Sequence, residues 1–518
     1  MDDQSLSDGV VISPGKAANG ADARVTHPVD LQPRALGDDP AAANVPLVVD
    51  LDGTLILSDT LVESALVLIK QKPWLVFSLA AWLLQGRAVV KAEIARRVKL
   101  SVENLPYRAE LLEYLKVERE AGRSVILATA AHGSIAEAIA AQTGLFAEVL
   151  ASDTEINLKG PRKRDALVER FGVRQFDYVG DSRDDVPVWE ASRVAHVAGA
   201  VTKAPASALA AGAMPGLAFS NRKPTFRTWL RAMRIHQWLK NVLVFIPPVM
   251  AHQINGEVMW PLAITFFAFS LLASATYIVN DLFDLASDRM HPKKSTRPFA
   301  SGELSIAQGF VSAVFLGVAG IALGATVGLP LVACLLAYLA MTLTYSHMLK
   351  NKPVIDVVLL AVLHTLRVFT GGIVSGFFIS AWLFQFSIFL FLSLAFVKRY
   401  SELRRLHMEE KSDTPGRGYR HGDRDIVSQA GVATGVAAGL VLALYINGQD
   451  IQRLYPRPYM LWIVCPLFVY WITRVWLIAH RGNMSEDPIL FAMHDKVSYI
   501  VGGLILGAAV LGMTPGAA

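Results

Sequence analysis

Two aspartates and a glycine follow the first apolar run of the chain. Residues Pro46 to Leu55 spell PLVVDLDGTL, so Asp50 and Asp52 come where a buried strand ends, and Gly53 allows a sharp turn. Because the chain leaves the strand here, both carboxylates can converge on one phosphate. One can attack phosphorus, the other can protonate the leaving oxygen, and Mg²⁺ would neutralise the charge between nucleophile and phosphate. The spacing predicts phosphoryl-group chemistry.

A second group of acids follows a long apolar run, in the stretch NDLFDLASDRMHPKKSTRP. On a helix, Asn280, Asp284 and Asp288 recur every four residues and share one face, with Asp281 at a neighbouring angle. Acids this close at the edge of a low-dielectric bundle repel one another unless cations lie among them. Oxygen-only ligands suit Mg²⁺, which usually also holds substrate phosphates. The pattern predicts a magnesium–diphosphate site.

Basic residues follow these acids at once. Lys293, Lys294 and Arg297 can bind the same diphosphate from another side. The alternative is a solvated loop in which the acids only cap helices. Acids that recur regularly as they leave a membrane helix are costly without a partner, which favours the site.

The two groups of acids lie in two halves of the chain that differ in hydrophobicity. From Trp238 onward, apolar runs of roughly 17–23 residues recur, each near the length that crosses a bilayer. We count nine and predict an all-α membrane bundle. The predicted parts are a disordered tail (1–43), an α/β domain (44–200) with a helical cap at about 59–114, a linker (201–226) and the membrane domain (227–518). The predicted spans start near Trp238, Val258, Ile306, Leu329, Val354, Ala381, Ser428, Tyr459 and Val497.

The charge pattern narrows the partners. The net charge of +5 could indicate nucleic acid, but the basic residues cluster beside apolar runs, which favours lipid headgroups and anionic substrates. The excess of Lys and Arg in one set of loops predicts that these loops and the soluble half face the cytoplasm. Cys334 and Cys465 lie inside apolar runs, so neither a disulfide framework nor a zinc site is expected.

The soluble half resembles the haloacid dehalogenase phosphatase superfamily, whose first motif is DxDGT. Three more pieces follow in the family's order: SVILATAA (124–131), NLKGPRKRDALVERFG (157–172) and FDYVGDSRDDVPVW (176–189). The resemblance implies a Rossmannoid α/β fold with a helical cap inserted after the first motif. That cap contains the apolar stretch PWLVFSLAAWLLQG (73–86), either as cap core or in contact with the membrane or the second domain.

The same resemblance implies roles for individual residues. Thr129 would bind phosphate through its hydroxyl, and Lys163, with Lys159 as a close rival, would hold nucleophile and phosphate together. The implied catalytic residues are Asp50, Asp52, Thr129 and Lys163, and the implied magnesium ligands are Asp50, Asp52, Asp181 and Asp185.

From about Phe226 to the C-terminus the chain resembles the UbiA superfamily of intramembrane prenyltransferases, through NDxxDxxxD after the second of nine spans. In that family the acids bind a diphosphate through magnesium. The implied ligands are Asn280, Asp281, Asp284 and Asp288, with Asp284 and Asp288 catalytic. Members that use aromatic acceptors usually carry a second acid motif, YxxxDxxxD, after the sixth span. Here that loop is FVKRYSELRRL (396–406), which lacks it.

The segments RIHQWLKNVLVF, RMHPKKSTRP and KRYSEL, with TYSHMLKNKP, resemble the decaprenyl-phosphate phosphoribosyltransferase branch, which joins phosphoribosyl pyrophosphate to a polyprenyl phosphate. Two phosphate-bearing substrates demand more Lys and Arg beside the acids than an aromatic acceptor does. The implied substrate ligands are Lys240, Asn241, Lys294, Arg297, Tyr345, Lys350, Arg367, Lys398, Arg399 and Glu402.

Three of these implied ligands lie in or beside predicted membrane spans. Lys240 and Lys398 have the alternative of snorkelling to the membrane interface. Arg367 lies inside the fifth predicted span, where a charge is costly and usually functional. Asp356, near the start of that span, is a candidate partner or a further metal ligand.

Together these features predict a bifunctional magnesium-dependent membrane enzyme, and the resemblance implies a bacterial inner membrane. The membrane half would transfer phosphoribose to a polyprenyl phosphate, and the soluble half, in the cytoplasm, would remove the 5-phosphate on the way to an arabinose or ribose donor. One alternative is prenyl transfer from a prenyl diphosphate to an aromatic acceptor, beside a phosphatase of unrelated substrate. Another is a transporter or anchor.

Overall fold

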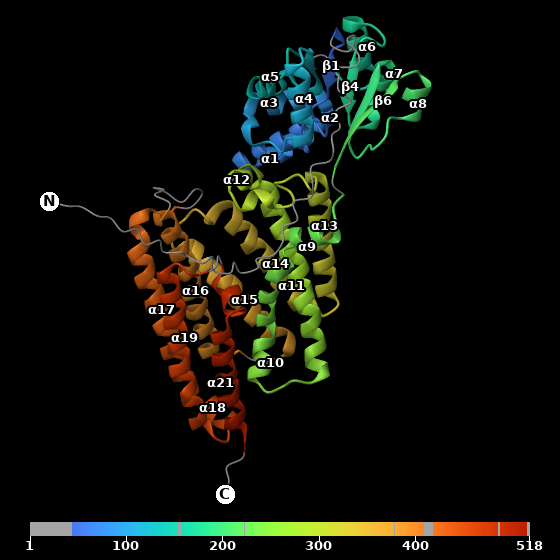
Figure 1. The fold of residues 1–518 in the computed structure, drawn as a ribbon. Coiled ribbons are helices and arrows are strands. Elements are labelled where there is room, and N and C mark those ends of the chain that lie inside the picture. Colours follow the sequence, from blue (N-terminus) through green and yellow to red (C-terminus); the bar gives the residue numbers. More distant parts are fainter. Residues whose placement is uncertain are drawn as a thin grey trace, which may run out of the picture.

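A computed structural model of the chain describes residues 44–153, 157–221, 223–377, 379–408, 418–484 and 487–514. The tail predicted for residues 1–43 lies outside these ranges. Figure 1 shows a soluble α/β domain standing on one end of a long helical bundle. Both the α/β domain and the all-α membrane bundle were predicted, and both are confirmed.

A six-stranded parallel sheet in the order β3-β2-β1-β4-β5-β6 organises the soluble domain. Apolar clusters on its two faces bury most strand side chains, as parallel sheets require. The strands are β1 (Leu47–Val49), β2 (Val125–His132), β3 (Glu148–Ser152), β4 (Asp177–Gly180), β5 (Val194–Gly199) and β6 (Met214–Ser220). The helices between them are α4 (Ala109–Glu120), α5 (Gly133–Thr143), α6 (Pro161–Phe171), α7 (Val186–Ala191) and α8 (Ala206–Ala210).

The last strand corrects the predicted linker at 201–226. Within that range α8 forms, and β6 pairs in parallel with β5, so the sheet continues to Ser220. The Ala, Gly and Pro content that indicated a linker is compatible with an edge strand, where proline and glycine are tolerated. Only residues 221–225 separate β6 from α9 (Phe226–Ala232).

Three helices and a 3₁₀ turn form the cap: α1 (Thr60–Gln71), α2 (Leu75–Gln85), α3 (Arg87–Arg97) and η3 (Val102–Asn104). One face of α2 packs on the cap core through Leu75, Leu79 and Trp82, but Trp74 and Phe77 are 65% and 79% exposed. This exposure favours the alternative that α2 contacts something outside the cap.

Eight helices in the described ranges are long and apolar enough to cross a membrane. They bury small and apolar residues between them and leave many large apolar side chains exposed on the outside of the bundle, as a lipid-facing surface does. They are α11 (Gly256–Phe283), α13 (Ile306–Ala325), α14 (Leu329–Thr344, extended by the π-helix η7, Tyr345–Leu349), α15 (Ile355–Ser375), α16 (Ala381–Met408), α17 (Arg424–Ile446), α19 (Val464–Arg481, preceded by the 3₁₀ helix η9, Pro458–Ile463) and α21 (Lys496–Met513).

The first of the nine predicted spans is the exception. The segment around Trp238 is a 3₁₀ helix, η5 (Ile235–Phe245), followed by the short α10 (Ile246–Met250). Pro247 and Pro248 cannot donate backbone hydrogen bonds, which breaks a continuous α-helix here. Figure 1 places α10 at the end of the bundle away from the soluble domain, so the segment still runs along the bundle.

The soluble domain rests on the bundle through α1, which lies against the end of α11 and the short α12 (Leu285–Met290) in Figure 1. Leu66 of α1 is 5% exposed and belongs to the same apolar cluster as Ile278 and Leu285 of the membrane half. Gly302, with φ +77°, lies under Leu57, and a Cβ there would stand 2.8 Å from the Cβ of Leu57. The two domains therefore share a packed, partly apolar contact.

Candidate functional site

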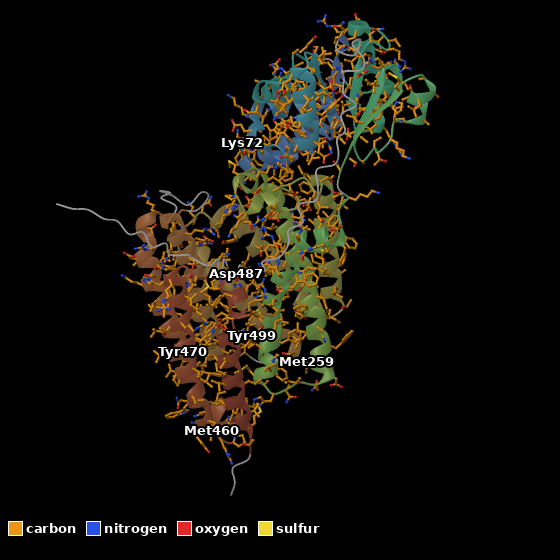
Figure 2. The ribbon with its side chains drawn as sticks, viewed as in Figure 1. Lys72, Met259, Met460, Tyr470, Asp487 and Tyr499 are labelled. Carbon is orange, nitrogen blue, oxygen red and sulfur yellow. The ribbon has the colours of Figure 1, made fainter. Side chains whose placement is uncertain are left out.

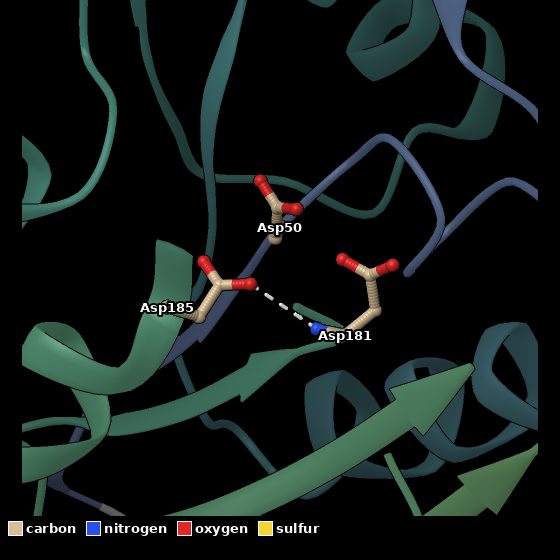
Figure 3. A group of neighbouring side chains, drawn as sticks. All are labelled: Asp50, Asp181 and Asp185. Carbon is tan, nitrogen blue, oxygen red and sulfur yellow. Dashed lines mark hydrogen bonds between the residues drawn. The ribbon is translucent and has the colours of Figure 1, made fainter. Parts of the chain in front are cut away.

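The carboxyl ends of β1 and β4 bring three acids together in the soluble domain. Asp50 follows β1, Asp181 follows β4, and Asp185 ends the 3₁₀ turn η4 (Arg183–Asp185). Figure 3 shows their side chains converging, with one oxygen of each within 4.8 Å of the others. The backbone N–H of Asp181 donates to Asp185 at 3.2 Å. A set of carboxylate oxygens is the donor chemistry that Mg²⁺ prefers, so these residues fit the predicted metal.

Lys163 is the lysine that reaches this group. Its Nζ donates to Asp50 Oδ1 at 2.7 Å and lies 3.4 Å from Asp185 Oδ1. The side chain is buried because α6 begins at Pro161 and points its first turn at the sheet edge. Lys159 instead pairs with the exposed Asp184 at 2.8 Å. Of the two rivals, Lys163 alone contacts the predicted nucleophile.

The three acids differ in proton affinity. Burial raises the pKa of Asp50 to about 6, with Lys163 opposing and Asp185 adding to the rise. Burial, together with the charges of Asp50 and Asp185, raises the pKa of Asp181 to about 8. Burial also pushes up the pKa of Asp185, but Lys163 and the hydrogen bonds from Tyr178 and Ser182 outweigh it and leave this pKa low. Near neutral pH a bound cation would therefore compete with protons here.

Asp52 lies outside the three-acid group. Its Oδ1 accepts the backbone N–H of Thr60 at 2.7 Å, and its Oδ2 accepts the Thr60 hydroxyl at 3.2 Å, at the start of α1. Burial, with the charge of Asp59, raises the pKa of Asp52 to about 7. A carboxyl that is partly protonated near neutral pH suits proton donation to a leaving oxygen better than metal binding.

Close packing also restricts which residues fit around the predicted nucleophile, Asp50. Gly53 has φ +78°, and a Cβ there would lie 2.2 Å from Asp181 Oδ2, so only glycine fits between the first motif and Asp181. Thr129 is fully buried in β2, next to β1 in the sheet, and its Oγ1 accepts the N–H of Ala131 at 2.9 Å.

The acids of the membrane half are divided between two sets of cations. Arg297 donates to Asp281 at 3.2 Å and to Asp288 at 2.5 Å, and Arg234 also pairs with Asp281. Asp284 instead accepts from Lys350 at 3.4 Å and from Lys70, a residue of α1 in the soluble domain.

The acids predicted to share one helix face thus differ in their partners, because Asp284 pairs with lysines and Asp288 with Arg297. Helix α11 ends at Phe283, and Asp284, with φ −100° and ψ 8°, caps it before α12 starts. The four-residue spacing nevertheless persists in the backbone, because the N–H of Asp284 donates to Asn280 O at 2.9 Å and the N–H of Asp288 donates to Asp284 O at 2.8 Å. In the described ranges, Asp50, Asp181 and Asp185 are the one group of three acids that close together.

The membrane acids nonetheless keep a donor set that fits Mg²⁺, because it consists of oxygen atoms. Burial tends to raise the pKa of Asp284, but Lys350 and Lys70 outweigh it and hold this pKa below its ordinary value. The carboxylate is thus ionised before any ligand arrives.

A second cationic group lies deeper in the bundle. Lys240 pairs with Asp487, and Arg367 donates to Asn241 at 2.7 Å and to the Tyr338 hydroxyl at 3.2 Å. Burial by itself would raise the pKa of Asp487. The charges of Lys240 and Lys398 outweigh this effect, so the pKa lies well below its ordinary value. His364 Nε2, on the same helix as Arg367, is buried without a hydrogen-bond partner. The group holds more positive than negative charge, which suits an anionic ligand.

Asp487 is absent from the predicted site. Figure 2 places it inside the bundle toward the soluble domain. Its Oδ1 caps α20 (Pro488–Ala492) by accepting the N–H of Ile489 at 3.1 Å. An Asp-Pro pair in a charged loop is the only sequence signal, and it indicates a helix cap rather than a site.

Arg399 is neutralised by other protein groups. It pairs with Asp356 and Glu402 and donates to the Tyr345 hydroxyl at 3.0 Å, while the Tyr419 hydroxyl donates to Asp356 at 2.7 Å. Asp356 is therefore the partner of Arg399, whereas Arg367, the candidate partner named above, bonds to Asn241 and Tyr338. This cluster ties helices together and leaves Arg399 less free for substrate than predicted.

Lys294 follows the acids of the membrane half in sequence, but in the described ranges no ion pair joins it to them. It opens the turn η6 (Lys294–Thr296), half-buried, with its backbone N–H donating to His291 Nδ1 at 3.4 Å.

Comparison with known proteins matches each half separately. Residues 242–496 match the UbiA prenyltransferase family, and residues 47–190 match the haloacid dehalogenase-like hydrolases. An uncharacterized protein of Sinorhizobium fredii, y4nM, is 36% identical over 473 residues, which cover 90% of this chain and 91% of that protein. The nodulation protein NoeC of Azorhizobium caulinodans is 34% identical over 291 residues, 56% of this chain and 94% of that protein.

Two further matches concern the membrane half. The decaprenyl-phosphate phosphoribosyltransferase of Corynebacterium glutamicum is 37% identical over 179 residues, 34% of this chain and 54% of that protein. A solved structure of a UbiA homolog from Archaeoglobus fulgidus, bound to GPP and Mg²⁺, aligns over 55% of this chain and 99% of its own, with a TM-score of 0.43 and 16% identity.

Proposed function

Because the chain belongs to the UbiA prenyltransferase family and carries an N-terminal haloacid dehalogenase-like hydrolase domain, we propose that it is a bifunctional membrane enzyme. Its membrane half transfers phosphoribose from phosphoribosyl pyrophosphate to a polyprenyl phosphate. Its soluble domain then removes the 5-phosphate from the lipid-linked sugar. Similarity to decaprenyl-phosphate phosphoribosyltransferases over part of the chain supports this choice of substrates.

The observation that carries the proposal is the surplus of cations around the membrane acids. Asp281, Asp284 and Asp288 are held by four cationic side chains, and Asp487 faces two lysines deeper in the bundle. An aromatic acceptor would bring little charge of its own, whereas a lipid phosphate and a sugar pyrophosphate together bring many negative charges. Such a pair of substrates matches the surplus.

In the transfer step, an oxygen of the polyprenyl phosphate attacks C1 of the ribose. The bond from C1 to the pyrophosphate oxygen breaks, and pyrophosphate leaves with the electron pair. Mg²⁺ held by the acids would supply positive charge to that leaving group. Arg297 and Lys350 neutralise the phosphates and fix their position, and these effects supply most of the rate because the nucleophile is already anionic.

In the hydrolytic step, Asp50 attacks the 5-phosphate and Asp52 protonates the ribose oxygen that leaves. Water then attacks the aspartyl phosphate, Asp52 takes a proton from that water, and phosphate and free Asp50 result. Lys163, which donates to Asp50, holds the carboxylate in line with phosphorus. Mg²⁺ at the three acids would offset the charge between Asp50 and phosphate.

Fusion and location follow from the same proposal. With the soluble domain and the charged loops on the cytoplasmic side of a bacterial inner membrane, the lipid-linked phosphate forms beside the enzyme that consumes it. Tethering raises its effective concentration at the second site.

The test is to supply the purified full chain with polyprenyl phosphate, phosphoribosyl pyrophosphate and Mg²⁺. The native chain should release the dephosphorylated lipid-linked sugar, and Asp50→Asn should accumulate the 5-phosphorylated form. Asp165→Asn, a change at an exposed aspartate that pairs with its neighbour Arg164, is the matched control. If Asp50→Asn yields the same product as the native chain, the coupled scheme is wrong.

The match to a prenyltransferase family favours one other candidate, prenyl transfer to an aromatic acceptor. Labelled prenyl diphosphate and labelled phosphoribosyl pyrophosphate, offered in parallel, separate the two. Label that enters the lipid fraction only from the sugar donor excludes prenyl transfer.

A further inference from the structure

The soluble domain reaches into the acid motif of the membrane half. Lys70, in the last turn of α1, donates from Nζ to the backbone oxygen of Phe283 at 2.7 Å and to Asp284 Oδ1 at 3.0 Å. Lys350 of the membrane half approaches the same oxygen at 3.4 Å. Two lysines from two domains therefore converge on one carboxylate oxygen.

Isolated surface ion pairs contribute little, and Lys70 is partly exposed. Its helix, however, is held firmly. Glu63 forms a two-pronged ion pair with Arg289, at 2.6 and 3.2 Å, and both side chains are buried. Leu66, one turn before Lys70, packs into the apolar cluster of the membrane half. Residues 63, 66 and 70 share one face of α1, so the docked helix sets where the ammonium group lies.

The chemistry of Asp284 indicates what Lys70 does when a substrate is present. A carboxylate oxygen that binds a divalent cation can no longer satisfy two ammonium groups. Lys70 and Lys350 then stand beside the anion held at the acid motif, and their natural new partners are its phosphate oxygens. Lysine binds phosphate as a point charge on a flexible stem, so a small shift suffices.

We propose that Lys70, a residue of the soluble domain, binds the diphosphate of the membrane transferase's substrate, so that the transferase site is complete only with the soluble domain docked. The inference rests on the proposed function in one respect: it needs a diphosphate at the acid motif. Phosphoribosyl pyrophosphate and a prenyl diphosphate meet that need equally.

The test is calorimetric titration of magnesium pyrophosphate into the purified full chain, with Asp50→Asn in every variant to silence hydrolysis. Lys70→Ala and Lys70→Gln should weaken binding about tenfold, the value of one charged hydrogen bond. Lys70→Arg should recover most of the affinity. Lys72→Ala is the matched control, because Lys72 is exposed two residues further on, as Figure 2 shows, and should bind like the parent.

Each result decides between alternatives. Equal binding by Lys70→Gln and the parent overturns the inference, and tighter binding overturns it in favour of a lysine that blocks Asp284. Binding that survives Asp284→Ala, or that the parent lacks, instead overturns the proposed function of the membrane half. Weaker binding with an unchanged melting temperature supports the inference, because the contact between domains is then intact.

Discussion

The two acid sites of this chain use the same residue type in opposite electrostatic settings. In the soluble domain, three carboxylates converge to within 4.8 Å, and one buried lysine contacts two of them. In the membrane half, each carboxylate is already paired with arginine or lysine. The first site carries excess negative charge and calls for a divalent cation. The second has four cations for its three acids before any ligand binds, and these cations can be shared with a polyanionic substrate.

The largest expected effect lies in the soluble site. Asp50→Asn removes the nucleophile and should reduce phosphate release to background, while Asp52→Asn should reduce it by about 10²–10⁴-fold, the usual contribution of a general acid. Phosphate release from an aryl phosphate measures both. Asp184→Asn, at an exposed acid outside the three-acid group, should behave like the native chain. Full activity of Asp50→Asn would refute the assignment of the nucleophile.

The membrane site should respond to the loss of a cation. Arg297→Ala removes the guanidinium shared by Asp281 and Asp288, and transfer to the lipid should fall by about 10²-fold, since charged hydrogen bonds contribute about 1.5–3 kcal/mol each. Transfer of label from the sugar donor measures this. Aryl phosphate hydrolysis by the same sample should stay at the native rate. An equal loss of both activities would mean that Arg297 supports the fold instead.

The contact between the sites can be weakened separately. Glu63→Gln removes the charge facing buried Arg289, and loss of a buried partner costs up to about 3–5 kcal/mol. Hydrogen exchange in α12 should become faster, and transfer should fall several-fold while aryl phosphate hydrolysis changes little. Glu93→Gln, in an exposed ion pair on α3, is the control. Unchanged exchange in α12 would show that this ion pair does not hold the domains together.

The smallest effect concerns pH. The pKa values of Asp50 and Asp181, about 6 and about 8, lie above the ordinary value of 3.8, so the folded metal-free site binds protons that the unfolded chain has released. The contribution of these two carboxyl groups to the free energy of unfolding of the metal-free domain is therefore greatest below pH 4. It is lost as the pH rises through 6 to 8. Added Mg²⁺ should protect β4 from hydrogen exchange more at pH 8 than at pH 6. The same gain at both pH values would contradict the raised pKa values.

Local sequence signals predicted that Asp50, Asp181 and Asp185 come together in the soluble domain. A strand that ends in DxDGT, and a second strand that ends before Asp181, place their acids at one sheet edge because neighbouring parallel strands share it. The spacing after Gly160 favoured Lys163, and the structure separates the two lysines by their partners, Asp50 for Lys163 and Asp184 for Lys159.

The membrane site was less predictable because its geometry depends on contacts far apart in the sequence. Nothing near Asp284 shows that α11 ends at Phe283, or that Lys70 approaches from another domain. Asp487 and Lys240 pair across most of the membrane half. Composition also misled where β6 joins the sheet, since an edge strand rich in Gly and Pro has the same residues as a linker.

The short connection between β6 and α9, residues 221–225, limits how far the soluble domain can move relative to the membrane half. Five residues span at most about 18 Å, and the first of them, Asn221, is fastened to Arg108 by a 2.7 Å hydrogen bond. The soluble domain therefore cannot move far from the membrane half to bind a substrate, as a domain on a long flexible linker could. Under the proposed scheme the lipid-linked sugar itself must move between the two sites, and the flexible lipid tail allows that movement.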